Sequence, residues 1–297
     1  MSTVAAATRP TTEDDITAEV IRRFEGTSDP RLKQIMQSLV KHMHGFLKEV
    51  QLTEAEWWQG IDFLTRTGHM SDDKRQEFIL LSDTLGVSMI TDLMSNRKPV
   101  GATESTVFGP FHREGAPRRK YGESIVDADR HGVPAFVAGR VLDLNGNPVA
   151  GAELDVWQAA ADGLYDVQDA SLTAMNMRGK FTTGAGGRYL VQTTRPVNYQ
   201  IPSDGPVGEM IRATNRHAWR PAHVHFVVSA PGFQTVTTHI FDSQDPYLDQ
   251  DAVFGVKSSL IVEFEAHTAP DEAARMYGAE PPFFTCNFDF VLVPAAK

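Results

Sequence analysis

The feature of the 297-residue chain that most limits its fold is a change of pattern near residue 100. Before that point, apolar residues recur three or four positions apart, from Ile35 through Leu39 and Met43 to Val50, which is the spacing of an amphipathic helix. After it, short apolar segments alternate with clusters of Gly, Pro and Asn, which is typical of strands joined by turns. The sequence therefore predicts an α+β protein with helices first and strands afterwards.

The helical section is expected to end at about residue 104, so that residues 1–104 and 105–297 form two domains. One helix covers residues 35–50, Thr53 and Glu56 form a capping box for a second, and Ser71 starts a third. The second domain is expected to be an antiparallel β-sandwich. Its predicted strands are residues 136–144, 152–158, 188–194, 222–229, 234–241, 259–265 and 285–293.

Composition excludes several classes of protein. Lys and Arg number 28 against 38 Asp and Glu, a net charge of −10, which argues against a nucleic-acid partner. No 18 apolar residues run together, so membrane insertion is not expected. The first 15 residues lack the apolar stretch of a signal peptide, and the single cysteine, Cys286, cannot form an internal disulfide. The expected location is the cytoplasm.

His223 and His225 are the first candidates for chemistry. Alternate residues of a strand point to the same face of its sheet, so both imidazoles can meet one metal ion. No carboxylate adjoins the pair, and imidazole alone suits Zn, Cu, Fe and Ni equally. The alternative is two half-exposed histidines on an ordinary strand face.

Tyr165 and Tyr199 each follow a predicted strand, where the chain enters a turn or loop. A phenol has a pKa of about 10 in water, so only a strong Lewis acid makes it a phenolate ligand at neutral pH. Fe(III) does this readily. The alternative is that each tyrosine is an amphipathic side chain at a sheet edge.

Several segments together resemble the intradiol ring-cleavage dioxygenases. They read AGRV, PVAGA, VWQA and GLYD between residues 138 and 166, and RPAHVHF at residues 220–226. These segments occur in the order and at the separation expected for that family. The resemblance extends from about residue 20 to the C-terminus and is greatest to the branch that cleaves hydroxyquinol.

The resemblance implies one Fe(III) per subunit, without flavin or nicotinamide. The implied iron ligands are Tyr165, Tyr199, His223 and His225. Tyr199 is also implied as a catalytic proton acceptor that leaves the metal when the substrate binds as a dianion.

Two further catalytic residues are implied by the same resemblance. Arg220 faces the developing carbanion of the substrate and stabilises it electrostatically. His239 stands where many catechol-cleaving relatives carry Gln, and its imidazole can hydrogen-bond near the iron.

The implied substrates are O2 and a small aromatic diol or triol. The family pattern places the substrate-binding residues at Leu80, Asp83, Val107, Phe108, Gly109, Pro110, Phe111, Ile201, Pro202, Arg220 and Val253. Asp83 is the discriminating position, because a carboxylate in an apolar pocket needs a partner and the third hydroxyl of 1,2,4-trihydroxybenzene can supply one. The expected product is 3-hydroxy-cis,cis-muconate, which tautomerises to maleylacetate, and the alternative substrates are catechol and chlorocatechols.

The helical section carries more apolar residues than its own core needs, including Ile90 and Leu93, which indicates an interface. By resemblance this is a homodimer interface, and a bound phospholipid is a further expectation. A non-enzymatic alternative remains, because residues 139–151 also resemble carboxypeptidase-regulatory-like binding modules. Those modules lack the RPAHVHF segment and the two tyrosines.

Overall fold

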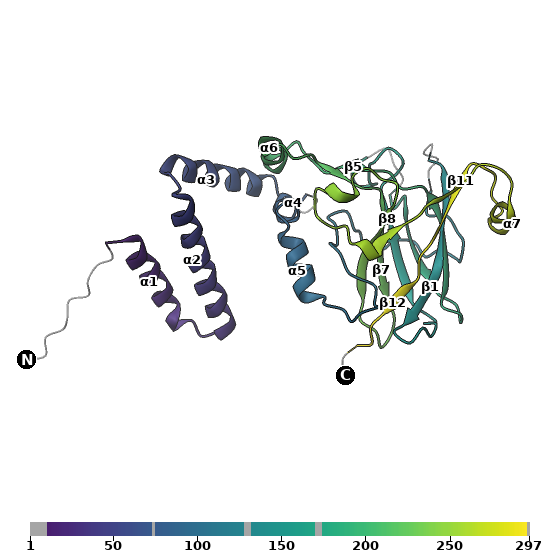
Figure 1. The fold of residues 1–297 in the computed structure, drawn as a ribbon, viewed down its shortest axis with the longest axis horizontal. Helices are drawn as coiled ribbons and strands as arrows, with labels where there is room; N and C mark the ends of the chain where they lie inside the picture. Colours follow the sequence, from purple (N-terminus) through teal and green to yellow (C-terminus); the bar gives the residue numbers. More distant parts are fainter. Residues whose placement is uncertain (1–10, 73–74, 128–131, 170–173, 296–297) are drawn as a thin grey trace, which may run out of the picture. The chain divides into compact units, whose positions relative to one another are not determined.

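A computed structural model describes residues 11–72, 75–127, 132–169 and 174–295 of the chain. The chain divides into two compact units, Met1–Thr65 and Arg66–Lys297. Figure 1 shows its helices and strands in chain order. The boundary between the units falls within α3 (Glu54–His69).

The first unit contains α1 (Glu13–Arg23), a short 3-10 turn (Phe24–Gly26), α2 (Pro30–Val50) and the start of α3. The capping box predicted at Thr53 is confirmed, because its backbone N–H donates to Glu56 Oε2 at 2.8 Å and its Oγ1 accepts from the Glu56 N–H at 3.3 Å. No residue of α1 or α2 is buried, and the predicted apolar stripe of α2 is about half exposed.

The helices of the second unit include α4 (Glu77–Thr84) and α5 (Val87–Ser95). The prediction that Ser71 starts the third helix is wrong, because α4 begins at Glu77. The Ser71 hydroxyl instead donates to the Thr67 carbonyl oxygen at 2.9 Å, so it closes the preceding helix. No single helix in the described ranges is long and apolar enough to cross a membrane, and α4 with α5 passes that test only as a pair bent by 78°.

Two five-stranded sheets form most of the second unit. In the first sheet, the central strand β1 (Pro134–Asp143) pairs on one side with β4 (Arg188–Thr194). On its other side it pairs with β11 (Phe283–Asn287) and β12 (Phe290–Leu292). Strand β10 (Glu265–His267) pairs with the far side of β11. In the second, the strand order is β3 (Arg178–Thr182), β2 (Glu153–Trp157), β7 (His223–Ser229), β8 (Val236–Asp242) and β9 (Ile261–Val262).

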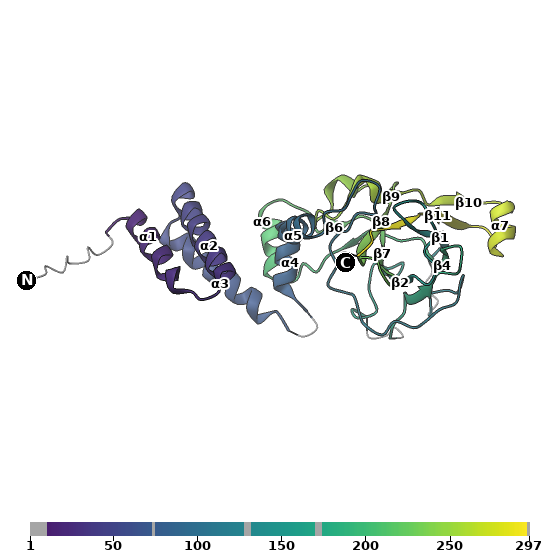
Figure 2. The same cartoon turned by 90° about the horizontal axis from the view of Figure 1, so that it is seen from below.

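Three smaller features complete the unit. Strands β5 (Tyr199–Gln200) and β6 (Trp219–Arg220) pair with each other, and α6 (Pro206–Ala213) lies between them in the chain. Helix α7 (Glu272–Tyr277) lies beyond the ends of β10 and β11 in both views (Figures 1 and 2). Short 3-10 turns occupy Leu248–Gln250 and Ser258–Leu260.

The α+β class is confirmed, but the expectation of purely antiparallel sheets is wrong. Strand β1 pairs in parallel with both β11 and β12, and β8 pairs in parallel with β9. The long connections between these partners provide the crossover that parallel neighbours require. The predicted strand at residues 285–293 is broken, because Asp289 turns to accept hydrogen bonds from the Arg140 backbone and side chain at 2.8 and 2.9 Å.

Alternation along β7 separates the core from the candidate site. Val224 and Phe226 are completely buried in the hydrophobic core that draws residues from both sheets. His223 and His225, one residue out of phase, therefore point to the opposite face of the second sheet. There a second apolar cluster, which includes Trp157, surrounds the candidate site.

Candidate metal centre and active site

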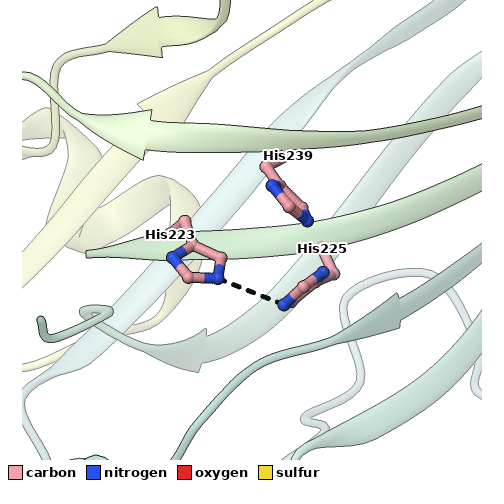
Figure 3. Close-up of side chains that lie close together, drawn as sticks. All are labelled: His223, His225 and His239. Atoms are coloured by element: carbon pink, nitrogen blue, oxygen red, sulfur yellow. Dashed lines mark hydrogen bonds between the residues drawn. The ribbon is translucent and has the colours of Figure 1, made fainter. Parts of the chain in front are cut away.

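Three histidines gather on the second sheet (Figure 3). His223 and His225 come from β7 and His239 comes from β8, directly opposite His225 in the register. The Nε2 atoms of His223 and His225 are 3.1 Å apart, and one nitrogen from each of the three imidazoles lies within 4.8 Å of the others. All three side chains are buried. The same-face placement predicted for His223 and His225 is confirmed.

The two candidate tyrosines reach the same point from loops. Tyr165 Oη lies 2.9 Å from His225 Nε2 and 3.2 Å from Tyr199 Oη. Gly163, with a positive φ of 82°, lets the loop of Tyr165 approach Tyr199 closely, since a Cβ there would lie 3.0 Å from the Tyr199 Cβ. The structure thus brings together the four side chains that the resemblance named as iron ligands.

The hydrogen bond at the far side of His223 sets its tautomer. Its Nδ1 lies 2.6 Å from the Pro221 carbonyl oxygen, so Nδ1 carries the proton and donates it there. Burial, and then the charge of Arg220, hold the pKa of His223 well below its usual range. The imidazole is neutral, and its Nε2 lone pair faces the cluster.

The same environment acts on His225 and Tyr165. Burial, and then the neighbouring His239, lower the pKa of His225 well below its ordinary value. Burial raises the pKa of Tyr165 well above 10, so a nearby cation is needed to hold this phenol as phenolate. A metal ion supplies such a charge.

The four donor atoms fit a metal ion by their spacing and chemistry. Two ligand atoms bound at about 2.1 Å and at a right angle to each other are about 3.0 Å apart. The distances from Tyr165 Oη to His225 Nε2 and from His223 Nε2 to His225 Nε2 are 2.9 and 3.1 Å. Two phenols and two imidazoles form a donor set of hard oxygen and intermediate nitrogen, which suits iron.

His225 is held between two rings in the plane of the sheet. Trp157 on β2 and His239 on β8 are its partners in the register, so they flank it on opposite sides. Trp157 stacks on it at 4.6 Å and 13°, while His239 meets it edge-on at 4.1 Å and 86°. Neither nitrogen of His239 has a hydrogen-bond partner among the described residues, so its predicted hydrogen bond near the iron stays a prediction.

Arg220 is buried beside the cluster, and the residue that holds it was not foreseen from the sequence. Its Nη1 lies 3.5 Å from Tyr199 Oη and 3.2 Å from His223 Nε2. The Asp251 carboxylate accepts hydrogen bonds from the Arg220 Nε at 3.1 Å and from its Nη2 at 3.4 Å. Burial disfavours the charge of Arg220, but Asp251 together with Tyr199 and Tyr165 outweighs this and raises the pKa of Arg220. Only the tertiary fold brings these two residues together.

The predicted substrate-binding residues surround the cluster in two groups. An apolar group packs with both tyrosines, and it consists of Leu80, Val107, Phe111, Ile201 and Val253. Phe111 stacks on Tyr165 at 4.6 Å, while Leu80, Pro110, Phe111 and Pro202 line a cavity of about 650 Å³. A second cavity, of about 490 Å³, is lined by Asp83, Val107, Phe108, Gly109 and Pro110 among others.

Asp83 is a buried carboxylate, only 5% exposed, on the inner side of α4. Burial raises the pKa of Asp83, and a hydrogen bond from Ser88 and the charge of Arg220 oppose that rise. Ser82 Oγ lies 2.9 Å from Ser88 Oγ. Asp83 therefore belongs to the same charged surroundings as Arg220, and it ends a short chain of hydroxyl groups.

Comparison with known proteins defines the class. The family described as "Dioxygenase" matches residues 107–294, and "Catechol dioxygenase N terminus" matches residues 29–103. The chain belongs to the intradiol ring-cleavage dioxygenase family, which is iron-dependent. This membership decides against the non-enzymatic binding module.

Particular relatives are similar along nearly the whole chain. The chain is 52% identical to the 6-chlorohydroxyquinol 1,2-dioxygenase of Cupriavidus pinatubonensis, over 95% of this chain and 98% of the relative. It is 48% identical to the hydroxyquinol 1,2-dioxygenase of Nocardioides simplex, over 99% of this chain and 100% of the relative. The crystal structure of the hydroxyquinol 1,2-dioxygenase of Pseudomonas putida superposes with a TM-score of 0.90 at 53% identity, covering 95% of this chain and 99% of that one.

Proposed function

We propose that this protein is a hydroxyquinol 1,2-dioxygenase, which inserts both atoms of O2 between the two adjacent hydroxylated carbons of 1,2,4-trihydroxybenzene. The ring-opened product is 3-hydroxy-cis,cis-muconate, the enol form of maleylacetate. The structural observation that carries the proposal is the buried carboxylate of Asp83 near a cluster of two phenols and two imidazoles. The names of the relatives at 48 to 53% identity support the same substrate.

The proposed cofactor is one Fe(III) per subunit, held by Tyr165, Tyr199, His223 and His225. When bound, it would supply a Lewis acid that keeps the phenols ionised and activates an aromatic diolate toward O2. Three distances between these donor atoms support this assignment: 3.2 Å from Tyr165 Oη to Tyr199 Oη, 2.9 Å from Tyr165 Oη to His225 Nε2 and 3.1 Å from His223 Nε2 to His225 Nε2.

Tyr199 and Arg220 carry the proposed proton and charge handling. The Arg220 Nη1–H donates toward Tyr199 Oη at 3.5 Å, and Tyr199 is the proposed acceptor of a proton from the substrate. The same guanidinium faces the cluster, where it can stabilise negative charge on the opening ring. Asp251 holds the guanidinium in that orientation.

Asp83 supplies the proposed selectivity. The Asp83 carboxylate is buried, and a third hydroxyl on the ring provides it with a further hydrogen bond that catechol cannot supply. Catechol and chlorocatechols remain the alternative substrates, and comparison of their rates with that of hydroxyquinol tests the assignment.

The proposed assembly is a cytoplasmic homodimer. Residues 1–104 would form the dimerisation domain and residues 105–297 the catalytic domain. Half-exposed apolar side chains along α2, such as Leu39, Met43 and Phe46, support an interface in the first unit. A phospholipid bound at that interface is part of the same proposal.

Oxygen uptake with hydroxyquinol, catechol and 3-chlorocatechol side by side tests the function. We expect uptake to be fastest with hydroxyquinol, and the concentrated enzyme to be red from phenolate-to-Fe(III) charge transfer. Tyr199→Phe should shift that absorption and remove most of the uptake while some iron remains. A colourless protein that contains no iron and consumes no O2 would contradict the proposal.

A further inference from the structure

We propose that the same pocket has a second activity: Asp83 catalyses the enol-to-keto isomerisation of the ring-opened product before that product leaves. This inference rests on the proposed function, because the enol hydroxyl is the third hydroxyl of the substrate. Before cleavage that hydroxyl is bonded to an aromatic carbon. Ring cleavage leaves the same carbon in a C=C bond, so the phenolic hydroxyl becomes an enol hydroxyl. The product is then an enol at the point where Asp83 is proposed to hold it.

The position of Asp83 supports this role. It lines the 490 Å³ cavity together with the loop of Val107, Phe108 and Gly109. That loop also approaches the metal centre, because a Cβ built on Gly109 would lie 3.0 Å from His225 Cε1. The carboxylate and the candidate metal ligand therefore both lie beside one short segment of chain.

The surroundings of Asp83 make it a proton acceptor. The Ser88 hydroxyl is hydrogen-bonded to the carboxylate, and its Oγ lies 2.9 Å from the Ser82 Oγ. No arginine or lysine among the described residues forms an ion pair with Asp83, in contrast to Asp251, which is paired with Arg220. Because burial raises the pKa of Asp83, it is more basic than an exposed carboxylate.

The proton transfer balances within the pocket. The enol O–H bond breaks, its proton passes to one oxygen of Asp83, and the O–H electron pair becomes the new C=O bond. The C=C electron pair then takes a proton from the carboxyl group, which forms a C–H bond at the adjacent carbon. Asp83 ends as the carboxylate, and no oxidant or second reactant is consumed. Arg220, whose charge reaches Asp83, can stabilise the enolate between the two transfers.

The test separates isomerisation from oxygenation. The Asp83→Asn variant, which by this inference releases its product as the enol, first converts the hydroxyquinol, and the end of O2 uptake marks completion. Excess wild-type enzyme, Asp83→Asn or Asp249→Asn is then added, and the decay of the enol absorbance is followed by stopped flow. Asp249 is an exposed carboxylate, so its variant is the matched control. Asn retains the shape and an acceptor oxygen but cannot take a proton.

We expect wild-type enzyme and Asp249→Asn to accelerate the decay in proportion to their concentration. Asp83→Asn should be at least about 100-fold less effective, because that is the usual minimum loss on removing a general base. Decay at the enzyme-free rate with excess wild-type enzyme, or equal acceleration by Asp83→Asn, would overturn the inference. Absence of O2 uptake when wild-type enzyme is mixed with hydroxyquinol would instead refute the proposed function.

Discussion

Replacing Asp251 by Asn should disable Arg220 without touching any candidate metal ligand. The two side chains form a buried pair with 3% and 2% of their side-chain surface exposed, joined through Nε at 3.1 Å and Nη2 at 3.4 Å. Asp251 is itself fixed by the backbone N–H of Gly255 at 2.9 Å. Asn keeps one acceptor oxygen and the size of the side chain, but it removes the negative charge.

The expected loss follows from these contacts. A hydrogen bond between charged groups contributes about 1.5–3 kcal/mol, which corresponds to roughly 10–150-fold in kcat/KM. Breaking a buried ion pair by removing one partner costs about 3–5 kcal/mol of stability, and the oxygen that Asn retains should keep the loss near the lower end of that range. The loss of kcat/KM should appear mainly in kcat, because the guanidinium is proposed to act on charge that develops during ring opening.

Steady-state O2 uptake gives kcat and KM, and urea unfolding gives the change in stability. The visible absorption of the iron-loaded variant reports whether the metal centre is intact, and Asp249→Asn controls for a general change of charge. If Asp251→Asn keeps kcat within about twofold of wild type while the absorption is unchanged, then Asp251 does not position Arg220 for the reaction.

Three other variants test the remaining assignments. Arg220→Lys retains the charge but loses the planar fork, so kinetics should show kcat falling more than substrate affinity; equal changes would place Arg220 in binding alone. The double variant His223→Ala, His225→Ala should contain almost no iron by metal analysis, and full iron content would exclude them as ligands. Asp83→Ala should lower kcat/KM for hydroxyquinol by roughly 10–100-fold and spare catechol cleavage, whereas proportional losses with both substrates would make Asp83 structural.

The parts of the fold that depend on local pattern could be predicted from the sequence. Strand periodicity alone placed His223 and His225 on one face, and the bounds predicted for β4 agree with the structure. The start of the third helix was wrong because Ser71 serves the helix before it, a choice that the local sequence leaves open. The break between β11 and β12 depends on a contact of Asp289 with Arg140, far earlier in the chain.

The site shows the same limit. Spacing could not join Tyr165 and Tyr199 to the histidines, so the resemblance to a family was needed for that step. Asp251 was missed altogether, because it meets Arg220 only through the fold of the loop after β8. The flanking of His225 by Trp157 and His239 follows from the strand register, which the sequence does not specify.

Gly109 has a consequence for anyone who wishes to change the substrate range of this enzyme. Its φ of 81° disfavours every side chain, and a Cβ there would lie 3.0 Å from His225 Cε1. A library that randomises this loop should therefore leave position 109 fixed, since mutants there would move His225 itself. Diversity is better directed to Val107 and Phe108, which line the 490 Å³ cavity and can change its volume.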